Sequence, residues 1–221
     1  MADIFNEIDE DLRRERAKKI WEKYGNLVIA AAVVVVLIVA GWRAYDYYRQ
    51  QQAEAAGDRF QQAVALSRDG KVAEAESALT SLVADAPSGY RTLARFRLAA
   101  ETASRDKAKG VEAYGALAVD GTVGPLLQAV ATIRAGYLMI DTAAYKDVAA
   151  KIEPLTRAGE PWRNSAREIL GLAAWKGKDL AAAGKWFEAI VADQEVTAPM
   201  RQRADMMLQL IAADAPPKAA S

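Results

Sequence analysis

The sequence predicts an all-α protein in which a single transmembrane helix is followed by a solenoid of about four helical hairpins and a C-terminal capping helix. Three observations lead to this fold class. An apolar run near the N-terminus carries no charged residue, helix-forming segments alternate with turns that contain Gly, Pro or Asp, and bulky residues recur along those segments at a regular interval. Alanine is abundant after the apolar run whereas Thr and Ile are sparse, which favours helices over strands.

The first 23 residues mix charged side chains with apolar ones at helical spacing. Ile4, Phe5, Ile8 and Leu12 fall on one face of a helix. We expect a short amphipathic helix that lies on the membrane surface or docks on a protein. A charged tail without a partner is the alternative.

The apolar run from Tyr24 to Trp42 is long enough to cross a bilayer. It holds about 19 residues without a charge, which gives a helix of roughly 28 Å. Its valines disfavour a helix in water, but in lipid every backbone donor and acceptor must be paired within the segment. Aromatic residues flank it as in interfacial belts: Trp21 and Tyr24 before, and Trp42, Tyr45, Tyr47 and Tyr48 after. The sequence therefore predicts a transmembrane helix over residues 24–42.

A cleaved signal peptide and a buried core strand or helix of a soluble protein are the alternatives for this run. The preceding segment is long and rich in acidic residues, unlike the short basic start of a signal peptide. Lysine and arginine set the orientation, with more before the run (Arg13, Arg14, Arg16, Lys18, Lys19 and Lys23) than after it (Arg43, Arg49 and Arg59). We expect a cytoplasmic N-terminus and, in a Gram-negative bacterium, an inner-membrane protein with a periplasmic C-terminal domain.

The rest of the chain repeats one event, in which a helix-forming segment ends at a turn and another begins. Short turns are expected at 68–71, 104–107, 141–142 and 176–179, and longer loops at 85–89, 120–125 and 157–161. Proline lacks the N–H donor that a first helical turn leaves unpaired. We therefore expect helices to begin at Pro125, Pro161 and Pro199.

Four bulky residues mark the hairpins: Leu79, Tyr114, Ile152 and Phe187. Their spacing of about 35 to 38 residues is typical of helix-pair solenoids. They belong to small-and-large apolar sets, which are Val72, Ala75, Leu79 and Leu82; Gly110, Tyr114 and Leu117; Tyr145, Val148, Ile152 and Leu155; and Ala183, Phe187 and Ile190. An irregular helical bundle is the alternative.

The last two units resemble the tetratricopeptide (TPR) repeat. Gly136 and Gly171 each lie sixteen residues before a bulky residue, and Leu170-Gly171, Ala183, Phe187 and Pro199 match the small-and-large signature of that repeat. A small residue is needed where two helices cross closely, and large ones fill the groove against the next hairpin. The first two units depart from the pattern, with Ala63 and Leu98 at the glycine position.

The predicted organisation has four parts. Residues 1–23 form a cytoplasmic segment, 24–42 the transmembrane helix, 43–213 a TPR-like helical-repeat domain and 214–221 a disordered tail. The last helix, from Pro199 to Ala212, is expected to cap the solenoid and to face solvent.

Composition excludes several kinds of chemistry. The chain has no cysteine and no histidine, which removes disulfides, thiolate catalysis, histidine-dependent triads and most zinc sites. Its net charge is zero, so nucleic acid is not an expected partner. The stretch from Gly171 to Asp179 only approaches a phosphate-binding loop, and carboxylates such as Glu74 and Glu76 suit solvated helix faces. We expect no catalytic residue, no cofactor, no metal site and no small-molecule substrate.

Three tryptophans are candidate partner-binding residues. Trp162, Trp175 and Trp186 could form binding hot spots, although core packing is the more common role of such residues in a solenoid.

The order of these features resembles the YfgM family, an ancillary subunit of the bacterial SecYEG translocon. The matching features are the charged N-terminal segment, the single span, the exit Gly41-Trp42-Arg43-Ala44-Tyr45, the Gln- and Ala-rich helix, and TPR-like units that end in one running from Gly171 to Val191. The resemblance implies a protein that associates with the translocon and with a PpiD-like periplasmic chaperone, and that helps exported client proteins to fold. A membrane-anchored scaffold for cell division or envelope assembly is the alternative.

Overall fold

The computed structural model describes the backbone of residues 2–214 and the side chains of Arg14, Lys18, Lys19 and residues 21–214. By its contacts the chain divides into two compact units, Met1–Ala55 and Ala56–Ser221. The described residues are helical apart from turns and contain no strand, so the all-α prediction is confirmed. The expected disordered tail falls almost wholly on residues 215–221, which lie outside the described part.

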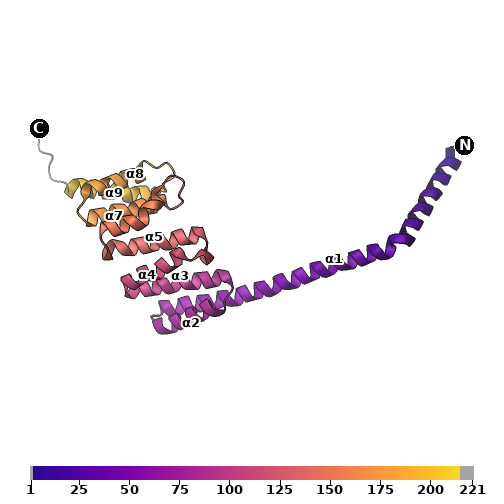
Figure 1. The fold of residues 1–221 in the computed structure, drawn as a ribbon, viewed down its shortest axis with the longest axis horizontal. Coiled ribbons are helices and arrows are strands. Elements are labelled where there is room, and N and C mark those ends of the chain that lie inside the picture. Colours follow the sequence, from indigo (N-terminus) through magenta and orange to yellow (C-terminus); the bar gives the residue numbers. More distant parts are fainter. Residues whose placement is uncertain (1, 215–221) are drawn as a thin grey trace. The chain divides into compact units, whose positions relative to one another are not determined.

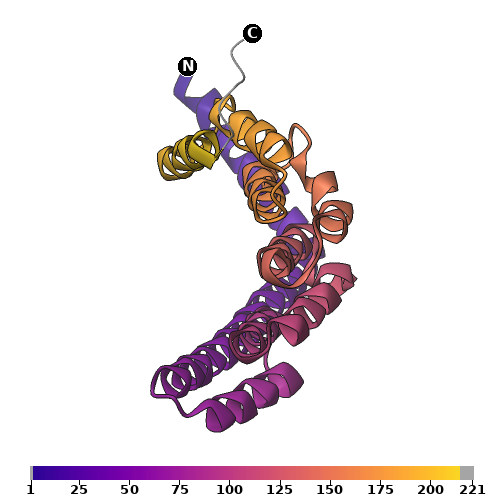
Figure 2. The ribbon, with the colours of Figure 1, turned by 90° about the vertical axis from the view of Figure 1, so that its left-hand side faces the viewer.

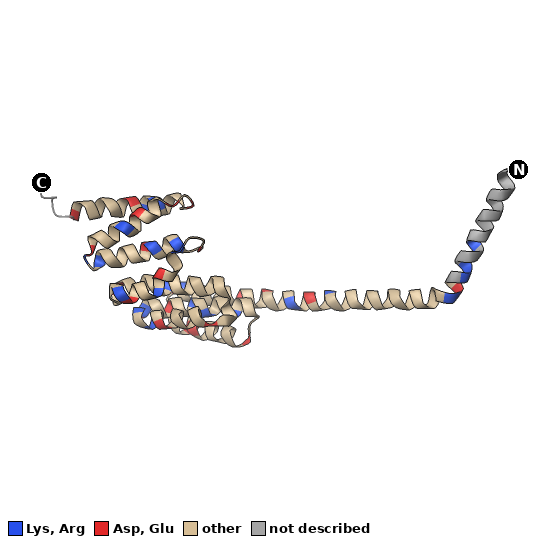
Figure 3. Cartoon of the chain, turned by 45° about the horizontal axis from the view of Figure 1, so that its top comes forward, with Lys and Arg blue, Asp and Glu red and all other residues tan. Residues whose placement is uncertain are grey.

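The first unit consists of most of helix α1, which runs from Ala2 to Arg68 (Figure 1). The part of this helix from Trp21 onward is long and apolar enough to cross a membrane, with a mean hydropathy of 2.5 over its best 18-residue window and none of that window buried. Figure 3 shows a run within this helix that is free of acidic and basic side chains, and in the sequence this run extends from Tyr24 to Trp42. The flanking aromatic rings are exposed, for example Trp42 at 70% and Tyr47 at 65%. The predicted amphipathic face before it involves side chains outside the described set.

The second unit contains four hairpins and a final helix. The end of α1 pairs with α2 (Val72–Asp85), α3 (Ser88–Arg105) with α4 (Lys107–Val119), α5 (Pro125–Thr142) with α6 (Tyr145–Ile152), and α7 (Arg163–Lys176) with α8 (Leu180–Val191), followed by α9 (Ala198–Asp214). Two short 3-10 helices, η1 (Gly121–Val123) and η2 (Glu153–Thr156), lie in the connections.

The helices of the second unit form two layers that follow an arc. In Figure 2 the first helix of each hairpin (α3, α5 and α7) lies on the inner side together with α9, and the second helix (α4, α6 and α8) lies on the outer side. From α2 to α9 the main contacts run between helices that are adjacent in the stack. This nearest-neighbour arrangement is that of a solenoid.

The turns fall where Gly, Asp and Pro predict them. Gly70 ends the first helix at a φ of 77°, a left-handed conformation that glycine adopts without a steric penalty. Pro125 begins α5 as predicted. The prediction for Pro161 is wrong, because α7 begins at Arg163 and the proline lies in the preceding turn. Pro199 is the second residue of α9 rather than its first.

The four predicted bulky residues all lie in the core, with Leu79 and Ile152 at 0% exposure, Phe187 at 1% and Tyr114 at 6%. The glycines sixteen residues earlier lie directly beneath two of them. A Cβ atom added to Gly171 would lie 2.8 Å from the Phe187 ring, and one added to Gly136 would lie 2.5 Å from the Ile152 Cδ1 atom. The large residue therefore packs on the glycine of its own hairpin as well as against the next one.

Helix α9 covers the end of the stack, as predicted for the capping helix. Ala204 and Ile211 pack with Phe187 and Ile190 of α8. The outer face of α9 is not wholly polar, however, because it exposes Met206 and Leu210.

Candidate protein-interaction surface

Helix α6 is the shortest of the helices that form the second half of each hairpin. It has 8 residues, whereas α2 has 14, α4 has 13 and α8 has 12. Pro154 follows two residues after its end and lacks a backbone N–H, so the α-helix stops and the chain continues as η2. The outer layer is therefore incomplete beside α6, and three grooves border this helix and its extension.

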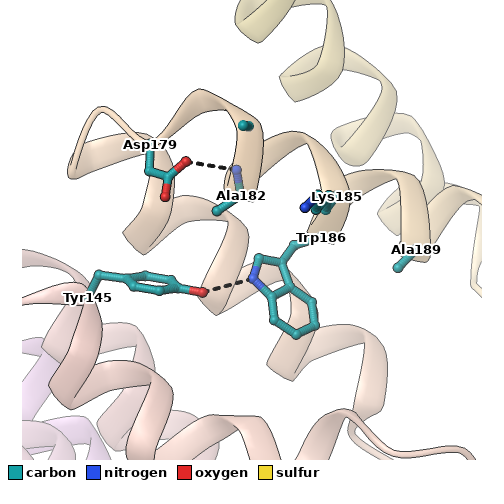
Figure 4. Close-up of a pocket in the computed structure, with 7 residues that line it drawn as sticks. Tyr145, Asp179, Ala182, Lys185, Trp186 and Ala189 are labelled. Carbon is teal, nitrogen blue, oxygen red and sulfur yellow. Dashed lines mark hydrogen bonds between the residues drawn. The ribbon is translucent and has the colours of Figure 1, made fainter.

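The largest of these grooves lies between α6 and α8 and has a volume of about 530 Å³. The Tyr145 ring and the Trp186 ring form its aromatic wall, and the Trp186 indole N–H donates a hydrogen bond of 3.1 Å to the Tyr145 hydroxyl (Figure 4). Ala181, Ala182 and Ala189 line the remainder with small side chains. We call this the α6/α8 groove.

A second groove, the α4/α6 groove, lies on the other side of α6 and has a volume of about 320 Å³. Most of the residues that line it are small or apolar. The lining consists of Gly115, Ala118, Val119, Thr132, Ala135 and Lys151. Val119 is 81% exposed at this place, although it is aliphatic. A third groove, of about 350 Å³, borders the last turn of α6 and η2.

Each of the first two grooves contains one lysine whose ammonium group has no hydrogen bond or ion pair within the described residues, Lys151 in one and Lys185 in the other. The single carboxylate that lines either groove is that of Asp179. It accepts a 2.9 Å hydrogen bond from the Ala182 N–H and so caps the N-terminus of α8. Asp179 keeps its negative charge at this cap, so the α6/α8 groove carries one charge of each sign and the α4/α6 groove a single positive charge. In both grooves the lysine is the charged residue without a partner among the described residues.

Other charged residues link successive hairpins instead. Asp141 of α5 accepts from Lys107 of α4 at 2.5 Å and lies 3.5 Å from the ammonium group of Lys176 of α7. The hydrogen bond from Lys107 and the charges of both lysines lower the pKa of Asp141. Such bridges fix the order of the helices and leave few charged groups for chemistry.

A polar network on the inner layer joins three helices, α5, α7 and α9. Glu168 of α7 is 7% exposed; it accepts a 2.5 Å hydrogen bond from the Tyr137 hydroxyl of α5 and one of 2.8 Å from Arg203 Nε of α9. Burial, followed by the hydrogen bond to Glu168, raises the pKa of Tyr137. Both partners of Glu168 belong to neighbouring helices of the stack, so the network is suited to holding these helices together.

The residues considered for chemistry lie apart from one another. Gly171 is buried under Phe187, which leaves no loop that could bind a phosphate there. Glu76 pairs with Arg105, and Glu74 is exposed. Within the described residues no group of three or more Asp or Glu side chains could hold a metal ion. These observations identify no catalytic arrangement.

The three tryptophans differ in their surroundings. Trp162 and Trp175 are half-buried against core clusters, and their indole N–H groups are buried without a hydrogen-bond partner. Trp186 lines the α6/α8 groove. Trp186 is half-buried as well, but of the three it is the one that lines a groove described above.

One family pattern covers most of the chain. The tetratricopeptide repeat-like domain matches residues 18–213, from before the apolar run to the last turn of α9. The chain belongs to this family. No curated protein and no solved structure matches it. A TPR-like domain is typically a scaffold for protein–protein interaction, and this chain has the same kind of architecture.

The grooves beside α6 could not be predicted from the sequence. The available signals were Pro154, which shortens the second helix of the third hairpin, and the alanines at the start of α8. Neither signal by itself indicates a groove, because a groove depends on what neighbouring helices leave unfilled.

Proposed function

We propose that this protein is an inner-membrane protein-interaction subunit, with a cytoplasmic N-terminus and a periplasmic repeat domain. The observation that carries this proposal is the apolar, wholly exposed stretch of α1, since the same helix continues into the first hairpin of a TPR-like unit. The greater number of Lys and Arg residues before the stretch than after it supports the orientation.

The proposed partners are the SecYEG translocon, a PpiD-like periplasmic chaperone and exported client proteins. This part rests on the resemblance to the YfgM family and on the TPR-like fold. Confinement to the membrane raises the effective concentration of the repeat domain near other membrane-held proteins, which favours an interaction role even at modest intrinsic affinity.

The topology can be tested cleanly because the chain has no cysteine of its own. Ser77 of α2 is exposed, and Ser77→Cys is expected to react with a membrane-impermeant maleimide once the outer membrane is opened. Lys18→Cys is expected to react only after the inner membrane is lysed. The reverse labelling pattern would overturn the proposed orientation.

The partners can be tested by crosslinking in membranes. A photoreactive residue at Arg134, which is exposed on α5 of the inner layer, is expected to capture Sec subunits and a periplasmic chaperone. Recovery of cell-division or envelope-assembly scaffold proteins without Sec subunits would contradict the translocon assignment. The same residue at Ser77 serves as a comparison site outside the inner layer.

A further inference from the structure

We propose that the grooves on the two sides of α6 together bind one extended acidic-and-apolar peptide segment of a partner protein. The inference rests on the proposed interaction function and assigns it a surface on the outer layer of the solenoid. The segment presents two aliphatic side chains, one for each groove, and two carboxylates on the same face, each two residues from an aliphatic side chain.

The size and lining of the two grooves indicate that the peptide inserts aliphatic side chains into them. Both grooves are lined mainly by Ala, Gly and aromatic or aliphatic side chains, and their volumes of 530 and 320 Å³ exceed what a single aliphatic side chain needs. Burying an apolar side chain in each releases water from an apolar lining. An aliphatic side chain in the α4/α6 groove would also cover Val119, which is exposed in the free protein.

The lysines of the two grooves indicate that the peptide carries carboxylates. Lys151 and Lys185 are the charged residues of the grooves whose side chains make no hydrogen bond or ion pair among the described residues. The carboxylate of Asp179 already accepts a hydrogen bond from the Ala182 N–H at the start of α8. An acidic residue of the partner complements each lysine. A basic residue placed at either point would face an unpartnered lysine ammonium group, which disfavours its binding.

The separation of the grooves indicates an extended chain. They lie on opposite sides of one helix, whose diameter with side chains is about 10–12 Å. Side chains on one face of an extended peptide repeat every two residues, or about 6.7 Å, so two positions four residues apart are separated by about 13 Å. We therefore assign the two aliphatic residues to positions i and i+4.

The test uses two labelled peptides and the full-length protein in detergent. The first is fluorescein-Gly-Glu-Gly-Leu-Gly-Glu-Gly-Leu-Gly, which places both Glu and both Leu side chains on one face of an extended chain. The second has Gln in place of both Glu residues. Fluorescence anisotropy at low salt is expected to give about fivefold tighter binding of the Glu peptide. Equal binding of the two peptides, or no binding of either, would overturn the proposal.

Charge-reversal variants locate the site. Lys151→Glu and Lys185→Glu are each expected to weaken the Glu peptide severalfold and to leave the Gln peptide unchanged. Lys71→Glu is the matched control, because Lys71 is also exposed and has no ion pair in the described part of the chain but lies at the start of α2. An equal loss with Lys71→Glu would mean that the effect is only one of net charge, and the assignment would be wrong.

A groove-filling variant tests the apolar part. A Cβ atom at Gly115 would meet only the Lys151 ammonium group, at 4.0 Å, so Gly115→Leu is expected to fold and to fill the α4/α6 groove. It should weaken both peptides severalfold. Gly184→Leu is the control, because Gly184 lies within a helix, has open space around it and lines neither groove.

Crosslinking in membranes separates failure of this inference from failure of the proposed function. If Gly115→Leu leaves the partners captured from Arg134 and the peptide affinities unchanged, the groove assignment is wrong and the interaction function stands. If it reduces capture of a partner without affecting the level of the protein in the membrane, the groove assignment is supported.

Discussion

The ring of Phe187 lies against the backbone of Gly171, so closely that a Cβ atom at position 171 would approach the ring to 2.8 Å. Both residues are almost fully buried, and they belong to the two helices of one hairpin. The contact explains why this hairpin needs a glycine in the middle of α7, where glycine otherwise weakens a helix.

We expect Gly171→Ala to destabilise the protein by about 1–2 kcal/mol, because the cost of overpacking exceeds the gain in helix propensity. Gly184→Ala should stabilise it by up to about 1 kcal/mol, since nothing lies within 4 Å of the added Cβ atom in α8. Urea unfolding followed by circular dichroism measures both changes. Equal effects of the two substitutions would contradict the role of the Phe187 contact.

The corresponding contact in the third hairpin predicts a coupled pair. Gly136→Ala is expected to cost about 1–2 kcal/mol, because the new Cβ atom would lie 2.5 Å from the Ile152 Cδ1 atom. Ile152→Val removes that atom and should cost about 1 kcal/mol by itself. The double variant should lose less stability than the two single variants together. A double-mutant cycle of urea midpoints measures the coupling, and simple additivity would count against this packing.

The network around Glu168 predicts a pH dependence at high pH. The pKa of Tyr137 is raised in the folded protein, chiefly by burial, so above the ordinary tyrosine pKa of about 10 the unfolded chain loses this proton first. The folded state then binds more protons, and its stability falls as the pH rises. Tyr137→Phe should lose less stability than the wild type between pH 9 and pH 12. Parallel losses in the two proteins would show that Tyr137 titrates normally.

The ion pairs at the end of α8 predict a dependence at low pH. Asp193 accepts hydrogen bonds from Arg163 Nε at 2.6 Å and Arg167 Nη1 at 3.0 Å, and the first of these is the main cause of its lowered pKa. Its contribution is therefore present above the ordinary aspartate pKa and is lost as the pH falls. Asp193→Asn should lower the Tm by about 5 °C at pH 7 and by progressively less below pH 4.

The control for this prediction is an exposed ion pair. Asp85 pairs with Arg59 at 3.1 Å, but the side chain of Asp85 is 59% exposed, so Asp85→Asn should change the Tm little at any pH. The side chain of Asp193 is only 9% exposed. If Asp85→Asn were as damaging as Asp193→Asn, burial would not be the reason for the importance of Asp193.

The hairpins could be predicted from the sequence because their signals are local. Gly171 and Phe187 lie sixteen residues apart, and a turn rich in Gly and Asp separates them, so the pairing follows from spacing alone. The links between hairpins were not predictable in this way. Glu168 contacts Tyr137 and Arg203, which lie 31 and 35 residues away, and nothing in the local pattern identifies those partners.

The incorrect helix start at Pro161 has a related cause. Proline is compatible with both the first turn of a helix and a tight turn before it, so its presence alone does not decide between them. In the structure the turn continues to Trp162, and Gly159 takes a φ of 87° ahead of it. The grooves beside α6 could not be predicted, because the sequence of a helix does not show which side chains of its neighbours are absent.

Because the helices from α2 to α9 pack mainly on their nearest neighbours, one end of the stack can unfold locally while the rest stays folded. Helix α9 has neighbours on one side only, whereas α5 and α7 lie between other hairpins, so fluctuations should begin at the free end and diminish towards the middle. Amide hydrogens of α9 should therefore exchange with deuterium sooner than those of α5, giving a graded rather than an all-or-none protection profile.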